Sequence, residues 1–178
     1  IQEAAQAVAG SLNVTHLDGS QHDLSGVWPQ IDLYGSLSEA TDQSVTPETA
    51  RATLEQMCSD VDIKFAPTWV SGKLVEELFE HYVIRTFTRP TFVMHFPVDT
   101  SPLTRDHRSR AGVVEKWDLY IDGFELATGY SELVDPVIQR ERLVEQASLG
   151  ANGDKEAMAL DEDFLRALEH GMPPSGGV

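Results

Sequence analysis

The sequence predicts an α+β fold made of helices and antiparallel hairpins. Helical stretches and hairpins are mixed along the chain, a regular strand–helix–strand alternation is absent, and no internal repeat or low-complexity tract interrupts the pattern. The 178 residues are 41% hydrophobic, which suits one globular domain with a substantial core. We therefore treat residues 1–178 as one structural unit.

Local signals place the elements of the N-terminal part. Gly10 stops an apolar helical stripe, and Asp18–Gly19 is a dipeptide that accepts positive φ in a tight hairpin turn. Thr46–Pro47 combines a capping residue with a proline that suits the first helical turn. The expected elements are a helix over 1–9, a hairpin over 13–24, a strand leading into a helix over 29–40, and a helix from 47 to about 58.

The C-terminal part carries stronger signals. Ser71 is placed to cap an amphipathic helix, and Pro97 ends an apolar strand. Asp135–Pro136 and Asp161 each mark the start of a further helix. The expected elements are a helix over 71–84, a strand over 90–96, a polar loop over 98–116, strands within 115–133, and helices after 135 and 161.

Charge and composition exclude several classes of function. Thirteen basic against twenty-nine acidic residues give a net charge of −16, so this stretch is not the main grip on a nucleic acid. A single cysteine, Cys58, excludes an internal disulfide and fits a reducing compartment. No apolar run approaches the roughly 20 residues of a membrane span. We expect a cytoplasmic segment without membrane contact, and a part of a longer protein, because the chain opens inside a helical pattern without Met.

The stretch WDLYIDGFELATGYSEL, residues 117–133, concentrates acids on a predicted hairpin. If Asp122–Gly123 forms its two-residue turn, Tyr120 faces Glu125, Leu119 faces Leu126 and Asp118 faces Ala127. Asp118 and Glu125 then become diagonal neighbours, roughly 5–8 Å apart at Cβ. Two carboxylates at that spacing can share a hard divalent ion, with the small Ala127 leaving room for it. The alternative is a solvated acidic sheet face.

Strict alternation creates a conflict further along this hairpin. It directs Thr128, Tyr130 and Glu132 to the other face, which Trp117 and Leu119 mark as the core side, and a lone buried glutamate is costly there. A bulge near Thr128–Gly129 would return all three to the acidic face.

Four segments in order carry a resemblance to a known family. The sequence is similar to the C-terminal half of the catalytic core of class II lysyl-tRNA synthetases, well over residues 70–178 and loosely before them. The matching segments are SGKLVEELFEHYV before PTFV, FPVDTSPLTRDHR, KWDLYIDGFELATGYSELVDPVIQRERL and LDEDFLRALEHGMPPSGG. The resemblance implies an antiparallel sheet flanked by helices. It makes residues 1–178 a partial catalytic domain, without the anticodon-binding domain and the arginine-bearing motifs, and inactive alone.

The resemblance also implies a reaction and a set of site residues. Lysine attacks the α-phosphate of ATP, and the lysyl group of the resulting adenylate passes to tRNA(Lys), without any nucleophilic side chain of the protein. Asp118 and Glu125 match the carboxylates that hold Mg²⁺ on ATP, while Thr128, Tyr130 and Glu132 match the residues that bind lysine. Thr128 stands where most members carry asparagine. A homodimer is implied as well.

Three alternatives stay open from the sequence. The same core occurs in bifunctional membrane proteins that lysylate phosphatidylglycerol, in which case the parent protein is membrane-associated. It also occurs in paralogues that lysylate a protein. A third alternative is a non-catalytic domain whose acidic face binds a basic partner.

Overall fold

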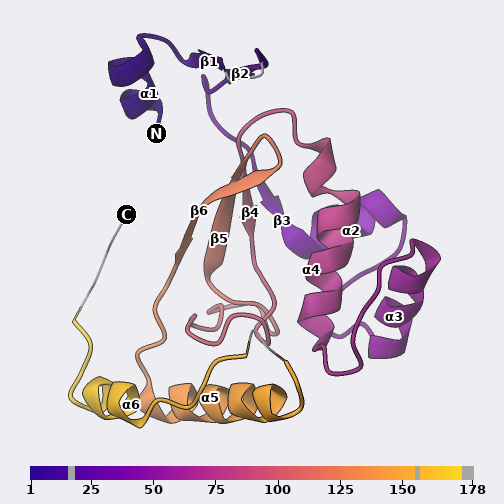
Figure 1. The fold of residues 1–178 in the computed structure, drawn as a ribbon, viewed down its shortest axis with the longest axis vertical. Coiled ribbons are helices and arrows are strands. Elements are labelled where there is room, and N and C mark those ends of the chain that lie inside the picture. Colours follow the sequence, from indigo (N-terminus) through magenta and orange to yellow (C-terminus); the bar gives the residue numbers. More distant parts are fainter. Residues whose placement is uncertain (16–18, 155–156, 174–178) are drawn as a thin grey trace.

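A computed structural model describes residues 1–15, 19–154 and 157–173. Within them lie helices, short strands and one 3-10 helix, arranged as Figure 1 shows. In chain order the elements are α1 (Gln2–Ala9), β1 (Asn13–Thr15), β2 (Gln21–Asp23), β3 (Gln30–Asp32), α2 (Leu33–Thr41), α3 (Arg51–Asp60), α4 (Ser71–Tyr82), η1 (Ile84–Thr86), β4 (Thr91–Met94), β5 (Lys116–Ile121), β6 (Phe124–Tyr130), α5 (Pro136–Ala151) and α6 (Glu162–Glu169).

The main sheet has four strands in the order β3-β4-β5-β6. The pairs β4–β5 and β5–β6 are antiparallel, whereas β3 and β4 are parallel because the helices α2, α3 and α4 form the crossover between them. Strands β1 and β2 make a separate antiparallel hairpin. The predicted α+β class is confirmed, with a sheet that is antiparallel apart from its β3 edge.

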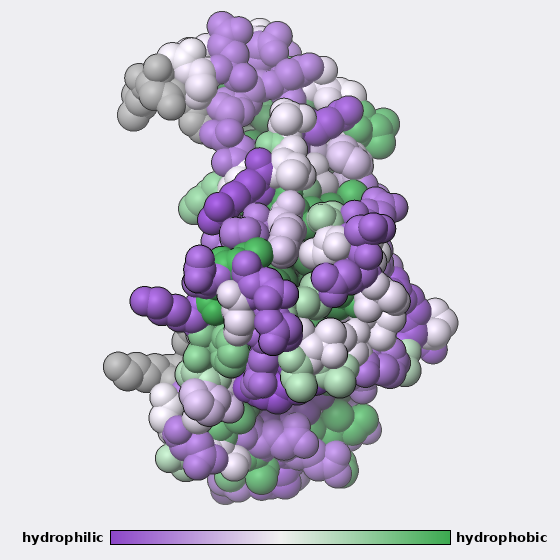
Figure 2. Space-filling view, turned by 90° about the vertical axis from the view of Figure 1, so that its right-hand side faces the viewer, coloured by the Kyte–Doolittle hydropathy of each residue, from purple (hydrophilic) through white to green (hydrophobic). Residues whose placement is uncertain are grey.

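Three helices cover one side of the sheet, and the last two lie across its end (Figure 1). The core forms where α2, α3 and α4 meet the sheet, and Val93 of β4 and Tyr120 of β5 belong to it. On the face of the molecule that carries these helices, hydrophobic residues are scattered among hydrophilic ones (Figure 2). None of the helices in the described ranges is both long and apolar enough to cross a membrane.

The helix boundaries test the capping predictions. The carboxylates of Asp135 and Asp161 accept backbone hydrogen bonds at the starts of α5 and α6, as predicted. Two predictions are wrong. Ser71 lies inside α4, whose N-cap is Val70, and α3 begins at Arg51 because the residues after Thr46 form a turn closed by Thr49 N–H to Thr46 O at 3.0 Å. The predicted turn at Asp18–Gly19 lies partly outside the described residues.

Candidate functional site

The β5–β6 hairpin begins as the sequence predicts. Asp122 and Gly123 have φ of 57° and 72°, the positive values that a tight two-residue hairpin turn requires. Ile121 pairs with Phe124 and Tyr120 pairs with Glu125. Local turn chemistry is therefore sufficient to define the first two pairs.

The register then shifts by one residue. Leu119 pairs with Ala127 and Asp118 pairs with Thr128, which leaves Leu126 as the extra residue of a β-bulge. The predicted pairs Leu119–Leu126 and Asp118–Ala127 are therefore wrong. A bulge is present, but it lies at Leu126, three residues after the turn, rather than at Thr128–Gly129.

The bulge decides which side chains share a face. Directly paired residues of an antiparallel ladder project to the same side, so Thr128 joins Asp118, and Tyr130 joins Lys116. Glu125 lies on that side through its partner Tyr120. Glu132 lies two residues beyond Tyr130, outside β6, in an isolated antiparallel bridge with Thr104. The bulge thus brings Asp118, Glu125, Thr128 and Tyr130 to one side of the sheet.

On this face, the side chains of β5 are more buried than those of the edge strand β6. Asp118 and Tyr120 are buried, and Val93, the β4 partner of Asp118, lies in the core. Glu125, Thr128 and Tyr130 are exposed on the edge strand. The predicted core face is wrong: Leu119 on the opposite side is buried, but the core cluster lies on the Asp118 side through Val93 and Tyr120, and Phe124 and Leu126 are 68% and 49% exposed.

Gly129 has a packing role rather than a bulge role. A Cβ at this position would lie 2.3 Å from the ring of Trp117, the residue paired with Gly129 across the hairpin. Gly129→Ala should therefore lower the free energy of unfolding by about 1–3 kcal/mol, measured by urea titration. Gly150→Ala is the matched control, because its Cβ would meet Ala157 at an ordinary 3.6 Å. Equal stability of both variants would contradict this packing account.

Asp118 is a buried carboxylate that is only half satisfied. The residue is 1% exposed, and its Oδ2 lies 3.0 Å from Nζ of Lys116. Its Oδ1 is buried without a hydrogen-bond partner. Burial raises the pKa of Glu125, and the nearby charge of Asp118 raises it further. Orphaned carboxylate oxygen beside a second acid is the donor chemistry of a hard divalent cation, so these two residues fit Mg²⁺.

The three other predicted residues lie along β6 and its continuation. Tyr130 is 42% exposed and borders a cavity of about 410 Å³. Glu132 is half-buried, and burial raises the pKa of its carboxyl. The hydroxyl of Thr128 donates to the backbone oxygen of Trp117 at 3.4 Å. The cavity is lined by Met94, His95, His107, Glu115, Lys116, Trp117, Tyr130 and Ser131.

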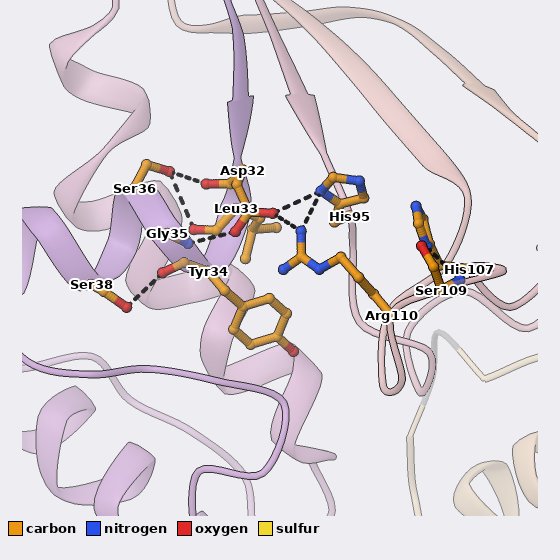
Figure 3. Close-up of polar contacts among 10 residues, drawn as sticks. All are labelled: Asp32, Leu33, Tyr34, Gly35, Ser36, Ser38, His95, His107, Ser109 and Arg110. Carbon is orange, nitrogen blue, oxygen red and sulfur yellow. Dashed lines mark hydrogen bonds and ion pairs between the residues drawn. The ribbon is translucent and has the colours of Figure 1, made fainter.

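His95, which lines this cavity, belongs to a polar cluster that the sequence analysis does not predict. Figure 3 shows this cluster, with Asp32 and Arg110 beside His95. Nδ1 of His95 lies 2.7 Å from Oδ2 of Asp32, and the Arg110 guanidinium bonds the same carboxylate. The other carboxylate oxygen accepts from the Gly35 N–H at 2.7 Å, at the start of α2. Burial alone would raise the pKa of Asp32, but these hydrogen bonds together lower it. The parallel β3–β4 pairing, invisible in the sequence, brings this cluster together.

Two arginines of the loop over 98–116 pair with nearby acids. Besides the Arg110 contact, Arg108 pairs with Glu115 at 2.8 Å. Arg108 and Arg110 of the segment TRDHRSR are therefore both paired with nearby acids. His95 has a φ of 65°, a left-handed conformation that is costly for a residue with a side chain.

Glu76 of α4 is a half-buried acid near Lys116. Its Oε1 accepts a hydrogen bond from the Thr100 hydroxyl at 2.7 Å. Burial raises the pKa of Glu76 from its ordinary 4.5 to about 7, against the opposing effects of Thr100 and of the Lys116 charge. The folded state therefore binds more protons than the unfolded state between these two values.

This excess of bound protons makes stability depend on pH. The free energy of unfolding should fall as pH rises from 4.5 through 7, and Glu76→Gln should remove that fall. At pH 8 the variant should be more stable than the unchanged protein by about 2 kcal/mol, and at pH 5 nearly equal to it. Urea titrations at both pH values measure the difference. Glu77→Gln, the neighbouring control, should keep the original slope; the same slope in Glu76→Gln would overturn the prediction.

No group of three or more His, Cys, Asp or Glu side chains suited to a metal is present in the described part of the chain. The predicted site at Asp118 and Glu125 contains only two carboxylates. It is of the kind that binds Mg²⁺ through one or two carboxylates, with substrate phosphates and water completing the coordination.

Comparison with known proteins covers the whole chain. The family described as tRNA synthetases class II (D, K and N) matches residues 1–178. A lysine–tRNA ligase of Kineococcus radiotolerans is 57% identical over 179 residues, and one of Mycolicibacterium gilvum is 55% identical over 180. A lysylphosphatidylglycerol biosynthesis bifunctional protein of Nocardia farcinica is 50% identical over 182 residues. Each alignment spans all of this chain, but only 36% of either ligase and 16% of the bifunctional protein.

Proposed function

Because this chain belongs to the class II tRNA synthetases (D, K and N), we propose that it is part of a lysine–tRNA ligase. The intact protein activates lysine with ATP and transfers the lysyl group to tRNA(Lys). The observation that carries the proposal is the buried, unpaired Oδ1 of Asp118 beside Glu125, on the face shared with Thr128 and Tyr130. The relatives support the proposal as well, because this chain is 50–57% identical to proteins named lysine–tRNA ligase.

Asp118 and Glu125 would hold the magnesium ion that accompanies ATP. When bound, that ion withdraws negative charge from the polyphosphate. Asp118 projects from a strand that is covered on its helix side, so its orientation is held by packing, while Glu125 at the edge stays accessible to nucleotide. The protein contributes positioning and charge, and no side-chain nucleophile is required.

Glu132 and Tyr130 would recognise the lysine side chain. The ε-ammonium pairs with the Glu132 carboxylate, and the Tyr130 ring packs on the aliphatic stem or the cation. Burial raises the pKa of Glu132, and an ammonium partner lowers it again, so ligand binding relieves the cost of a half-buried charge. The hydroxyl of Thr128, which now donates to Trp117, has less reach than the asparagine amide expected at this position.

The substrates, assembly and compartment of the whole protein are further proposals, because this chain spans about a third of the length of the ligases it matches. Lysine, ATP and tRNA(Lys) are its proposed substrates, a homodimer its assembly and the cytoplasm its compartment. The similarity to the bifunctional protein supports one alternative, in which the same ligase core belongs to a membrane-associated protein that also acts on phosphatidylglycerol.

Lysine-dependent ATP–pyrophosphate exchange in the intact protein tests the proposal. Exchange measured in parallel with lysine, arginine, ornithine and aspartate should be supported best by lysine and should require Mg²⁺. Exchange with aspartate but not with lysine would reject the lysine assignment. No exchange with any of the four amino acids would favour a non-catalytic domain. The length of the intact protein, and the presence of membrane spans outside this chain, would separate the two contexts.

A further inference from the structure

We propose that the Lys116 ammonium occupies the cation site at Asp118 until a divalent ion replaces it, so that Lys116 sets how tightly the metal is held. The inference rests on the proposed function, since it concerns the same carboxylate. It assigns to Lys116 a positioning role and leaves the identity of the metal ligands unchanged.

The geometry places Lys116 as an internal cation. Its Nζ lies 3.0 Å from Oδ2 of Asp118, and the two side chains are 22% and 2% exposed. Residues 116 and 118 are two apart on β5, so both project to the same side of the sheet. The ammonium also lies 4.1 Å from the centroid of the Phe96 ring, which adds a favourable cation–π contact. Lys116 is therefore packed in place beside the carboxylate.

This ion pair gives only one of the two carboxylate oxygens of Asp118 a partner. A buried carboxylate needs compensation for the loss of hydration, and Lys116 provides it on one oxygen only. A divalent ion would use that carboxylate at closer range and with twice the charge, but it would lie beside the lysine ammonium. Two cations at such separations repel each other strongly in a partly desolvated site. Asp118 therefore exchanges one cation for the other.

Once released from Asp118, the Lys116 ammonium can interact electrostatically with a second acid. The charge of Lys116 acts on Glu76 of α4 as well as on Asp118. Tyr130, the cross-strand partner of Lys116, borders the cavity into which the ammonium can turn. The lysine can therefore leave Asp118 without becoming an uncompensated buried charge.

Manganese binding to the full-length protein tests the exchange. Free Mn²⁺ is followed by its electron paramagnetic resonance signal, without nucleotide, in the unchanged protein and in Lys116→Met. Loss of the competing charge should tighten Mn²⁺ binding by about tenfold or more. Without metal, Lys116→Met should melt at a lower temperature than the unchanged protein, and Mg²⁺ should raise its Tm by more. Lys116→Gln, which keeps a hydrogen-bond donor for Asp118 but no charge, provides a second uncharged variant.

Controls separate this inference from the proposed function. Lys73→Met, which removes a surface ion pair with Glu77 on α4, should bind Mn²⁺ like the unchanged protein. Asp118→Asn should lose the binding; if it does not, the metal assignment of the proposed function fails. If binding depends on Asp118 but either folded uncharged variant keeps the original affinity, the Lys116 exchange alone is overturned. It is also overturned if neither uncharged variant folds even with Mg²⁺, because the lysine would then be indispensable.

Discussion

Asp118→Asn should abolish most lysine-dependent ATP–pyrophosphate exchange in the intact protein, with a fall in kcat of about a hundredfold to a thousandfold. The substitution keeps the size of the side chain and removes the charge that is proposed to bind Mg²⁺. The effect is large because the carboxylate is 1% exposed, so its interaction with a cation is little screened by water. In a site where positioning and charge neutralisation supply most of the rate, no other residue replaces this group.

The hairpin supplies a matched control for this variant. Asp122→Asn makes the same chemical change at the exposed turn, where the carboxylate lies 3.4 Å from His22 Nε2. Asparagine also tolerates the positive φ of that residue. Asp122→Asn should retain near-normal exchange. Full exchange in Asp118→Asn at saturating Mg²⁺ would remove Asp118 from the metal site.

Glu132→Gln should raise the KM for lysine by about a hundredfold, with a much smaller change in the KM for ATP. A charged hydrogen bond to the ε-ammonium is lost, and the cation of the ligand is left partly desolvated without a partner. The measurement is exchange as a function of lysine concentration at saturating ATP. Glutamine keeps the shape of the side chain, so a folding defect is not expected.

The complementary variant is Glu125→Gln, which lies before the bulge on the same face as Asp118. It should raise the requirement for ATP and Mg²⁺ and leave the KM for lysine nearly unchanged. This split between two substrates would place the two acids in separate subsites. If both variants changed the two constants equally, or changed neither, the division of the acidic face into a metal clamp and an amine pocket would be wrong. A purely interaction-based domain predicts no effect of either change.

Much of the fold followed from rules that act over a few residues. Capping by Asp135 and Asp161 was predicted because a carboxylate can reach the free N–H groups of its own helix start. The Asp122–Gly123 turn and its first two strand pairs were predicted because positive φ is tolerated there. The start of α3 was predicted wrongly, because Thr46–Pro47 also suits a turn that ends before the helix.

The candidate site was predicted as a set of residues but not as a geometry. A bulge was needed to bring Tyr130 and Glu132 to the acidic face, and the sequence offered Gly129 as its place. Gly129 instead makes room for the Trp117 ring, and the extra residue is Leu126, which has no special turn chemistry. Lys116 could have been found from the sequence, since its spacing of two from Asp118 places both on one side of a strand.

By itself, the sequence determined the element types, the hairpin turn and the order of the matching segments. Only the tertiary structure decided the shifted register, the burial of Asp118 beside Lys116 and the meeting of Asp32 with His95 and Arg110. Capping and turn formation depend on neighbours a few residues away, which the sequence displays directly. Strand register, burial and the parallel β3–β4 contact depend on surfaces that meet only after distant segments pack together.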